Sequence, residues 1–188
     1  MKKIILSIFS VALLIFAGCT ENVTSVNTPV TSKKQILKVV GKDGLNLGLL
    51  NALTRTKSIT GDLGGFMFLG GRNNSENFPV SYFVTLTIPP KAFSGKTDIS
   101  MTLDLENAAI VFTPHMVFNK PLNLNLTFTG LDLSSLDLSK GNVGFYYVDD
   151  EGNFTPVQNS GIIINSSTGT LGVLNAKINH FSRYAFAQ

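Results

Sequence analysis

The sequence has few of the residues from which catalytic and metal sites are built. Among 188 residues there are one Cys, two His and no Trp, and charged residues make up only 14%. A zinc site needs three or four Cys, His or carboxylate ligands, so we expect no transition-metal centre. Neither a Gly-rich phosphate loop nor a nucleophile elbow occurs, and we expect no cofactor.

The chain also lacks the strong positive charge of nucleic-acid-binding proteins. Lys and Arg number 15 against 12 Asp and Glu, and two of the lysines, Lys2 and Lys3, belong to a leader. This small surplus gives no reason to expect nucleic acid as a partner. The 17 Gly, 14 Phe and 44% hydrophobic residues favour strands and turns in one domain with a real core.

The first eighteen residues form an export signal. Lys2 and Lys3 give a positive start, residues 4–16 are an apolar stretch of signal-peptide length, and small residues precede Cys19. The apolar run is marginal for crossing a bilayer and a polar stretch follows it, so a transmembrane anchor is not expected. We therefore interpret 1–18 as a cleaved signal peptide.

The residues before the only cysteine, Phe16-Ala17-Gly18-Cys19, resemble the lipobox of bacterial lipoproteins. The resemblance implies that Cys19 is acylated and begins the mature chain, although the family usually has Leu where this chain has Phe16. The alternative is an ordinary secreted protein with a stray cysteine. Two or three acyl chains suffice for stable membrane anchoring. Thr20 is not the Asp that retains some lipoproteins in the inner membrane, which favours the outer membrane or cell surface.

Residues 19–57 are expected to link this anchor to the folded domain. Residues 20–32 are rich in Thr, Ser, Asn and Pro and have no apolar face, which favours a flexible tether. The approach segment, residues 33–57, has six basic residues and one acidic one. It is either a membrane-surface patch or a solvated stretch, the commoner cause of such runs. Its leucines fit both strand and helix spacing, so its secondary structure stays open.

Beyond Ile59, apolar residues alternate with polar ones, which is the pattern of half-buried strands. The alternation is clear at 80–88, 99–106 and 122–129. Further short strands are expected at 66–69, 109–112, 143–148, 154–157, 161–164, 169–173 and 176–187. Turn-forming residues separate these segments. We therefore predict an all-β fold, a two-sheet antiparallel β-sandwich over residues 58–188.

Five short motifs in order carry a resemblance to a known module. They are Gly64-Gly65, Leu86 to Phe93, Phe118 to Leu122, Tyr147 to Val157 and His180 to Tyr184. Together they resemble the ZU-five type domain, the β-sandwich module of ankyrins, netrin receptors and zonula occludens proteins, in the version found in bacterial lipoproteins. Departures are Lys91, where Gly is usual, and Phe154, where Trp is common. The resemblance implies binding more than catalysis, although a fold does not fix function.

Other candidate sites have simple structural explanations. Asp149, Glu151 and Asn153 have the spacing of the first calcium-loop ligands, but the Gly and Glu that such a loop needs later are missing, so a hairpin turn is the better interpretation. Exposed aromatic side chains would favour a glycan or protein ligand, although aromatics in such a sandwich are more often core. The candidates are Phe83, Tyr146 and Tyr184. His115 is interpreted as a polar loop residue.

The expected function is not enzymatic. The chain is interpreted as a lipid-anchored protein of the cell envelope, attached to the membrane through Cys19, whose β-sandwich binds a protein or glycan. A structural domain without a ligand is one alternative.

The tripeptide His180-Phe181-Ser182 carries the other alternative, because in some ZU-five type domains the chain cuts itself between this Phe and Ser. Ser182 Oγ would attack the Phe181 carbonyl, His180 would take the hydroxyl proton, and water would hydrolyse the resulting ester. The competing interpretation is that 180–184 forms the closing strand of the sandwich, with Phe181 and Tyr184 packed and His180 hydrogen-bonded.

Overall fold

The structure of the protein is a computed structural model that describes residues 34–42, 53–72, 79–136 and 142–188. The predicted signal peptide, Cys19 and the predicted tether lie outside the described residues. No helix in the described ranges is long and apolar enough to span a membrane. The strands are β1 (Leu53–Thr60), β2 (Gly65–Arg72), β3 (Ser81–Ile88), β4 (Lys96–Asp104), β5 (Ala109–Thr113), β6 (Val117–Thr129), β7 (Gly144–Val148), β8 (Phe154–Pro156), β9 (Gly161–Asn165), β10 (Thr170–His180) and β11 (Arg183–Ala187).

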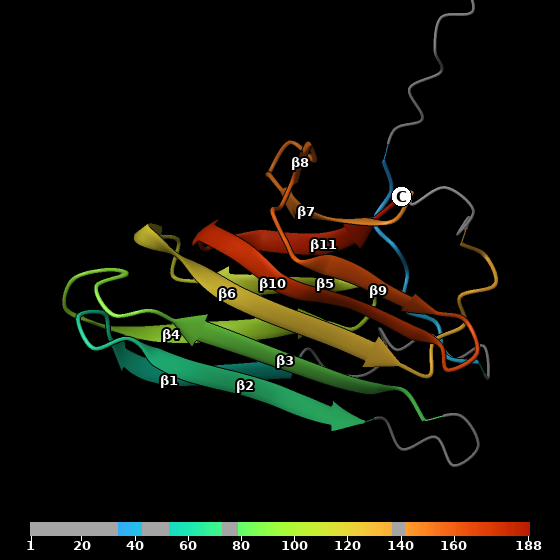
Figure 1. Cartoon of the computed structure of the whole chain (residues 1–188), viewed down its shortest axis with the longest axis horizontal. Coiled ribbons are helices and arrows are strands. Elements are labelled where there is room, and N and C mark those ends of the chain that lie inside the picture. Colours follow the sequence, from blue (N-terminus) through green and yellow to red (C-terminus); the bar gives the residue numbers. More distant parts are fainter. Residues whose placement is uncertain (1–33, 43–52, 73–78, 137–141) are drawn as a thin grey trace, which may run out of the picture. The chain divides into compact units, whose positions relative to one another are not determined.

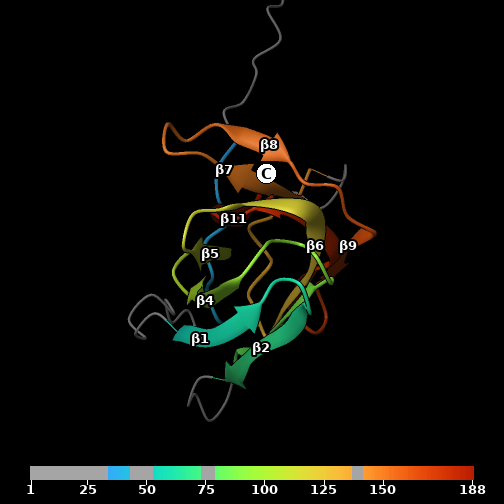
Figure 2. The ribbon, with the colours of Figure 1, turned by 90° about the vertical axis from the view of Figure 1, so that its left-hand side faces the viewer.

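The strands form two antiparallel sheets packed face to face, which confirms the predicted all-β sandwich (Figure 1). One sheet has six strands in the order β1-β4-β5-β11-β7-β8, and the other has five in the order β2-β3-β6-β10-β9. The end-on view in Figure 2 shows β4 and β5 on one side of the core and β6 and β9 on the other.

The core consists of the apolar residues that the alternation predicted to point inward. Strands β3, β4 and β6 contribute every second side chain, because successive side chains of a strand point to opposite faces. The fully buried residues of three such strands are Val84, Leu86 and Ile88 in β3, Ile99, Met101 and Leu103 in β4, and Leu122, Leu124, Leu126 and Phe128 in β6. Burying each of these side chains stabilises the fold by roughly 1.5–3 kcal/mol.

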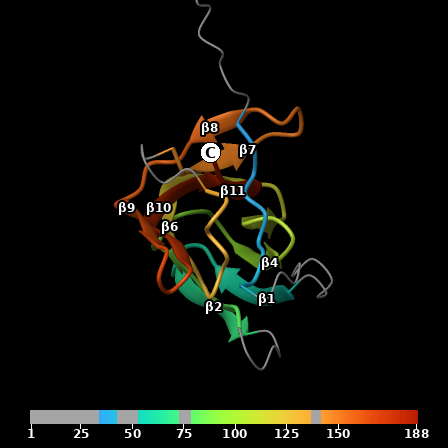
Figure 3. The ribbon, with the colours of Figure 1, turned by 90° about the vertical axis from the view of Figure 1, so that its right-hand side faces the viewer.

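Residues 34–42, which we call the strap, run in extended form along the sandwich (Figure 3, blue). The Leu37 amide donates to the Phe186 carbonyl at 2.9 Å, and the Asp132 amide donates to the Val40 carbonyl at 2.8 Å. The side chains of Leu37 and Val39 are buried in the core. One compact unit includes the strap together with the sandwich, and β1 begins five residues before Ser58, where we predicted the domain to start.

The basic residues of the approach segment contact the sandwich. Lys38 forms an ion pair with Glu106 at 2.8 Å. Lys33 lies outside the described residues, and the other four bind backbone carbonyls or rings: Lys42 donates to the Ser167 carbonyl, Lys57 donates to the Phe66 carbonyl, Lys34 lies over the Tyr146 ring, and Arg55 lies over the Phe68 ring. These contacts give the basic run a structural role in the part of the chain that is described.

The last strands differ from the prediction. Strand β10 is continuous where we expected a break after Val173, because the irregularity between Val173 and Ala176 is a bulge. Asn175 adopts a φ of 50° there, and its amide donates to Asn125 Oδ1 at 2.9 Å. Asn tolerates this left-handed conformation better than most residues, so the strand bulges and continues. The predicted strand at 176–187 is instead divided by a bend at Phe181 and Ser182, after which β11 joins the other sheet.

The strap generates a stability prediction. Replacing Val39, whose side chain is fully buried, with Ala should lower the free energy of unfolding by roughly 1–3 kcal/mol, because it leaves a cavity in the core. Val40→Ala removes the same atoms from the neighbouring, half-buried side chain and should cost clearly less. Urea unfolding of both variants measures the difference. Equal, small effects would show that the strap is not part of the cooperative unit.

Candidate functional site

The tripeptide His180-Phe181-Ser182 lies where the chain leaves one sheet for the other. His180 ends β10, Phe181 and Ser182 form the bend, and β11 follows. The segment is therefore a crossover between the sheets and not one closing strand. Phe181 and Tyr184 are buried, as the packed interpretation required.

The backbone of this crossover is held on both sides. The Phe181 amide donates to the Met116 carbonyl at 2.8 Å, and the Phe112 amide donates to the Ser182 carbonyl at 3.0 Å. The Tyr184 hydroxyl donates to the His180 carbonyl at 2.6 Å. Burial raises the pKa of Tyr184, so this phenol stays protonated and able to donate at neutral pH.

His180 has a ring nitrogen available for proton transfer. Its Nδ1 is buried and has no hydrogen-bond partner among the described residues. The ring packs edge-on against Tyr147, with centroids 4.5 Å apart, and lies 6.2 Å from the ring of His115. Burial lowers the pKa of His180, the charge of His115 acts in the same direction, and the Phe181 backbone opposes them. The ring is therefore neutral at pH 7 and could accept a proton, but no hydrogen bond among the described residues joins it to the Ser182 hydroxyl.

The carboxylate of Asp149 is used by a turn. Both of its oxygens accept hydrogen bonds from Asn153, from the backbone amide at 2.7 Å and from the side-chain amide at 2.9 Å. These bonds lower the pKa of Asp149. Strands β7 and β8 pair on either side, so the hairpin-turn interpretation of 149–153 is confirmed. In the described ranges, no group of three or more His, Cys, Asp or Glu is placed to hold a metal ion.

Three phenyl rings lie exposed on the five-stranded sheet. Of the predicted candidates, Phe83 is 55% exposed, whereas Tyr184 is buried and Tyr146 is half-buried beneath Lys34. Sequence reasoning missed Phe66 and Phe68, which are 47% and 54% exposed. The run Phe66-Met67-Phe68-Leu69 is apolar on both faces of its strand, and this absence of alternation in an edge strand was the available signal.

We call the side of this sheet that points away from the core the outer face. Besides the three rings it carries Thr85, Thr87, Asn123, Asn125, Thr127 and Lys177. The strand register aligns these residues in rows, with Phe68, Thr85 and Asn125 in one row. In the next row Phe66 and Thr87 precede Asn123, whose Oδ1 accepts a hydrogen bond from Lys177 Nζ at 2.6 Å. Phenyl rings therefore lie beside rows of hydroxyl and amide groups.

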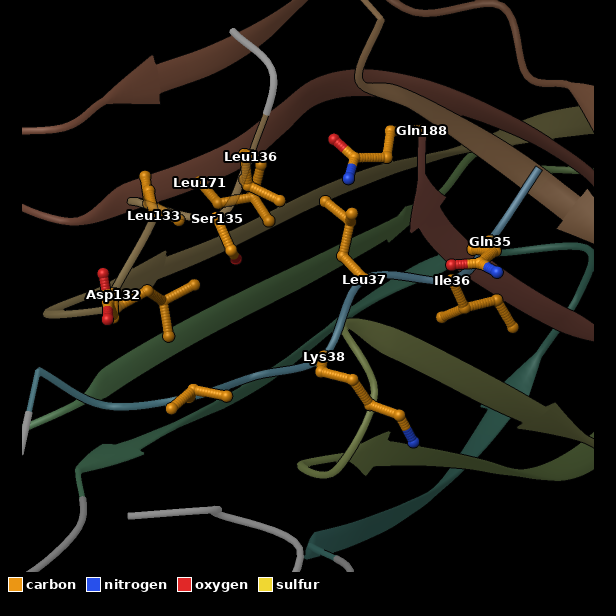
Figure 4. Close-up of a pocket in the computed structure, with 12 residues that line it drawn as sticks. Gln35, Ile36, Leu37, Lys38, Asp132, Leu133, Ser135, Leu136, Leu171 and Gln188 are labelled. Carbon is orange, nitrogen blue, oxygen red and sulfur yellow. The ribbon is translucent and has the colours of Figure 1, made fainter. Parts of the chain in front are cut away.

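A separate pocket of 240 Å³ lies between the strap and the residues that follow β6 (Figure 4). Leu133, Leu136 and Leu171 gather on one side, with Leu37 and Gln188 on the other. Gln188 Oε1 is buried without a hydrogen-bond partner among the described residues. The charged groups nearby are occupied, since Lys38 pairs with Glu106 and Asp132 accepts from the Ser134 amide. The lining offers apolar contact and one amide, and it offers no nucleophile.

The environment of His180 predicts a pH dependence. Unfolding raises its lowered pKa back to the ordinary 6.5, so the unfolded chain binds a proton that the folded chain resists. Stability should be complete above pH 6.5 and fall as the pH drops below it. Urea midpoints at pH 7.5 and 5.5 should therefore differ less in His180→Gln than in the unsubstituted protein. His115→Gln is the control and should keep most of the difference, because burial is the larger cause; an unchanged slope in His180→Gln would contradict the assignment.

No protein-family model matches the chain, and no curated protein sequence matches it. The resemblance to ZU-five type domains therefore stays a proposal.

Proposed function

We propose that the protein is a lipid-anchored lipoprotein of a bacterial envelope, and that its β-sandwich is a binding module and not an enzyme. The observation that carries the anchoring is the position of Cys19, the only cysteine, directly behind an export signal. Acyl chains on its sulfur and amine would hold the chain at a membrane. Thr20 favours the outer membrane or cell surface.

The outer face supports the assignment of a binding role. Soluble proteins expose single apolar side chains freely, but neighbouring exposed rings on one face are typical of interaction surfaces. Phe66, Phe68 and Phe83 are such a group, each about half exposed. They lie on a rigid sheet, which presents them without the entropy loss of ordering a loop.

Two backbone conformations support the resemblance to ZU-five type domains. Gly64, in the first of the matching motifs, has a φ of 73°, and a side chain there would collide with the Ile88 carbonyl. Lys91 stands where the family usually has Gly and adopts a φ of 65°. A left-handed conformation costs most residues other than Gly about 1–2 kcal/mol. At position 91, where the chain departs from the family pattern, Gly would thus adopt the observed backbone conformation more easily than Lys does.

The anchoring can be tested directly. Cys19→Ala should move the protein from the membrane fraction to the soluble or secreted fraction and abolish labelling by a fatty-acid analogue, because no other cysteine can be acylated. Thr20→Ala is the matched control and should keep both membrane association and label. An unsubstituted protein that takes up no label would overturn the lipoprotein assignment.

Self-cleavage between Phe181 and Ser182 is the second candidate function, and the neutral His180 ring, whose Nδ1 has no hydrogen-bond partner among the described residues, favours it. In that reaction Ser182 Oγ bonds to the Phe181 carbonyl carbon, the peptide C–N bond breaks, and the Ser182 amine is freed. Water then splits the ester and leaves a carboxylate on Phe181. Strand β11 pairs with both β5 and β7, so it would remain bound after cleavage.

The packing of the crossover leads us to expect an uncleaved chain. The Phe181 ring is fully buried, and the backbone on both sides of the bond is hydrogen-bonded. Intact-mass spectrometry of the denatured protein after long incubation should show no species ending at Phe181. Such a species, present in the unsubstituted protein and absent in Ser182→Ala, would establish self-cleavage.

A further inference from the structure

We propose that the outer face of the five-stranded sheet binds an acidic polysaccharide, that is, a polymer of pyranose rings carrying carboxylates. This inference rests on the proposed function for its setting outside the cytoplasm, and it deepens that function by naming the ligand class and the site. It is carried by three properties of the face: exposed rings, ordered amide and hydroxyl groups, and a complete absence of acidic residues from its strands.

The rings form a strip along the edge of the sheet. Phe66 and Phe68 are alternate residues of β2 and are therefore about 7 Å apart along the strand. Phe83 of β3 pairs with Gly70, and its ring lies over this glycine, where an added Cβ would stand 3.1 Å from the ring. Pyranose rings have an apolar face of C–H bonds and a rim of hydroxyls, and the apolar face packs on flat aromatic surfaces of this kind.

Polar groups beside the strip are held in position and keep unused hydrogen-bonding capacity. Asn125 Nδ2 donates to Thr85 Oγ1 at 3.0 Å, and Asn125 Oδ1 accepts from the Asn175 amide at 2.9 Å. An amide has two donor hydrogens and two acceptor lone pairs. Among the described contacts, Asn125 thus retains one donor and one acceptor for sugar hydroxyls. A side chain fixed in this way loses little entropy when a ligand binds.

The charge of the outer face favours a negatively charged ligand. None of the five strands β2, β3, β6, β9 and β10 contains an Asp or Glu. Arg55 and Lys57 of β1 adjoin Phe66 and Phe68, and Arg72 lies on β2 itself. Lys177 of β10 lies farther across the same sheet, three strands from β2, where it donates to Asn123 Oδ1. The ion pairs of the described residues, Lys38 with Glu106 and Arg183 with Asp104, involve none of them. A cleft of 160 Å³ lies where Arg55 and Lys57 meet Phe66 and Phe68, so cation and ring can contact one sugar together.

A carboxylated glycan fits this face better than a lipid bilayer does. The rings lie within a sheet together with Thr85, Asn123 and Asn125, so a bilayer that covered the rings would also strip water from these polar groups, at a large cost for each group left unpaired. A sugar polymer provides hydroxyls for the same groups. Single-stranded nucleic acid also combines stacking surfaces with negative charge, and the experiment below distinguishes it.

The test uses the full-length protein purified in detergent. Affinities are measured for polygalacturonate, alginate and hyaluronan. Methyl-esterified polygalacturonate is the matched probe, because it keeps the sugar rings and lacks the carboxylate charge. We expect binding to at least one carboxylated polymer, weaker binding as salt is added, and at least tenfold weaker binding after esterification. Phe68→Ala and Phe83→Ala should each weaken binding about fivefold. Val117→Ala, which truncates an exposed side chain of β6 six residues before Asn123, should leave it unchanged.

Three outcomes would overturn the inference: no binding to any of the carboxylated polymers, tighter binding to oligo(dT) than to all of them, or equal binding by the Phe variants and the Val117 variant. Circular dichroism and the urea midpoint confirm that each variant is folded. The outcome is separable from that of the anchoring experiment, because polymer binding is measured on purified protein whether or not Cys19 carries lipid.

Discussion

The ring of Phe181 ties the two sheets of this sandwich together. Consecutive strands β10 and β11 belong to different sheets, so the chain has to turn through the core between them. The Phe181 ring fills that position, stacked on Phe112 with centroids 5.0 Å apart and edge-on to Phe118 at 4.7 Å. Phe112 belongs to the six-stranded sheet and Phe118 to the five-stranded one. One buried side chain therefore contacts both layers at the point where the backbone crosses between them.

The same constraint sets the chemistry of the crossover. A buried peptide needs partners for its polar groups, and here Met116 and Phe112 provide them on opposite sides of the Phe181–Ser182 bond. Attack by Ser182 Oγ on the Phe181 carbonyl requires the peptide to distort, and every distortion here also strains the packing of Phe112 and Phe118. The described backbone at 180–182 has no residue with positive φ, the form in which strain is visible elsewhere, at Lys91. Self-cleavage thus requires the peptide at Phe181 to distort, whereas the packing of the crossover requires Phe181 to stay in place.

Strands could be predicted from the sequence wherever one face of the strand is exposed to solvent and the other is buried. In β4 and β6 polar residues mark the solvent side, so alternation identifies both the strand and its buried face. In β2 both faces are apolar, which left Phe66 and Phe68 indistinguishable from core residues although a strand was expected at 66–69. The crossover was missed although the alternation breaks there: the buried residues Ile178, Phe181 and Tyr184 are three positions apart, and the bend between them became visible only in the tertiary packing of Phe181.

Other features depended on contacts distant in the chain. The strap owes its conformation to hydrogen bonds with residues near 106, 132 and 186, and nothing within 34–42 encodes an isolated strand. The bulge at Asn175 depends on the side chain of Asn125, fifty positions earlier. Of the candidate sites, the turn at 149–153 was predictable because its hydrogen bonds are local, whereas the outer face required the strand register to bring its rows together.

The proposed display on a membrane would change what affinity the proposed glycan-binding outer face requires. A flat face with three half-exposed rings and a few ordered amides makes fewer contacts than an enclosed pocket, so a single domain would bind one stretch of polymer weakly. When many lipid-anchored copies face one long polymer, the first copy that binds holds the polymer near the others. The remaining copies then bind it at a high effective concentration. The overall attachment can then be strong while each contact remains reversible. An open, acid-free sheet suits that arrangement, because a polymer can settle on it anywhere along its length without threading an end into a cavity.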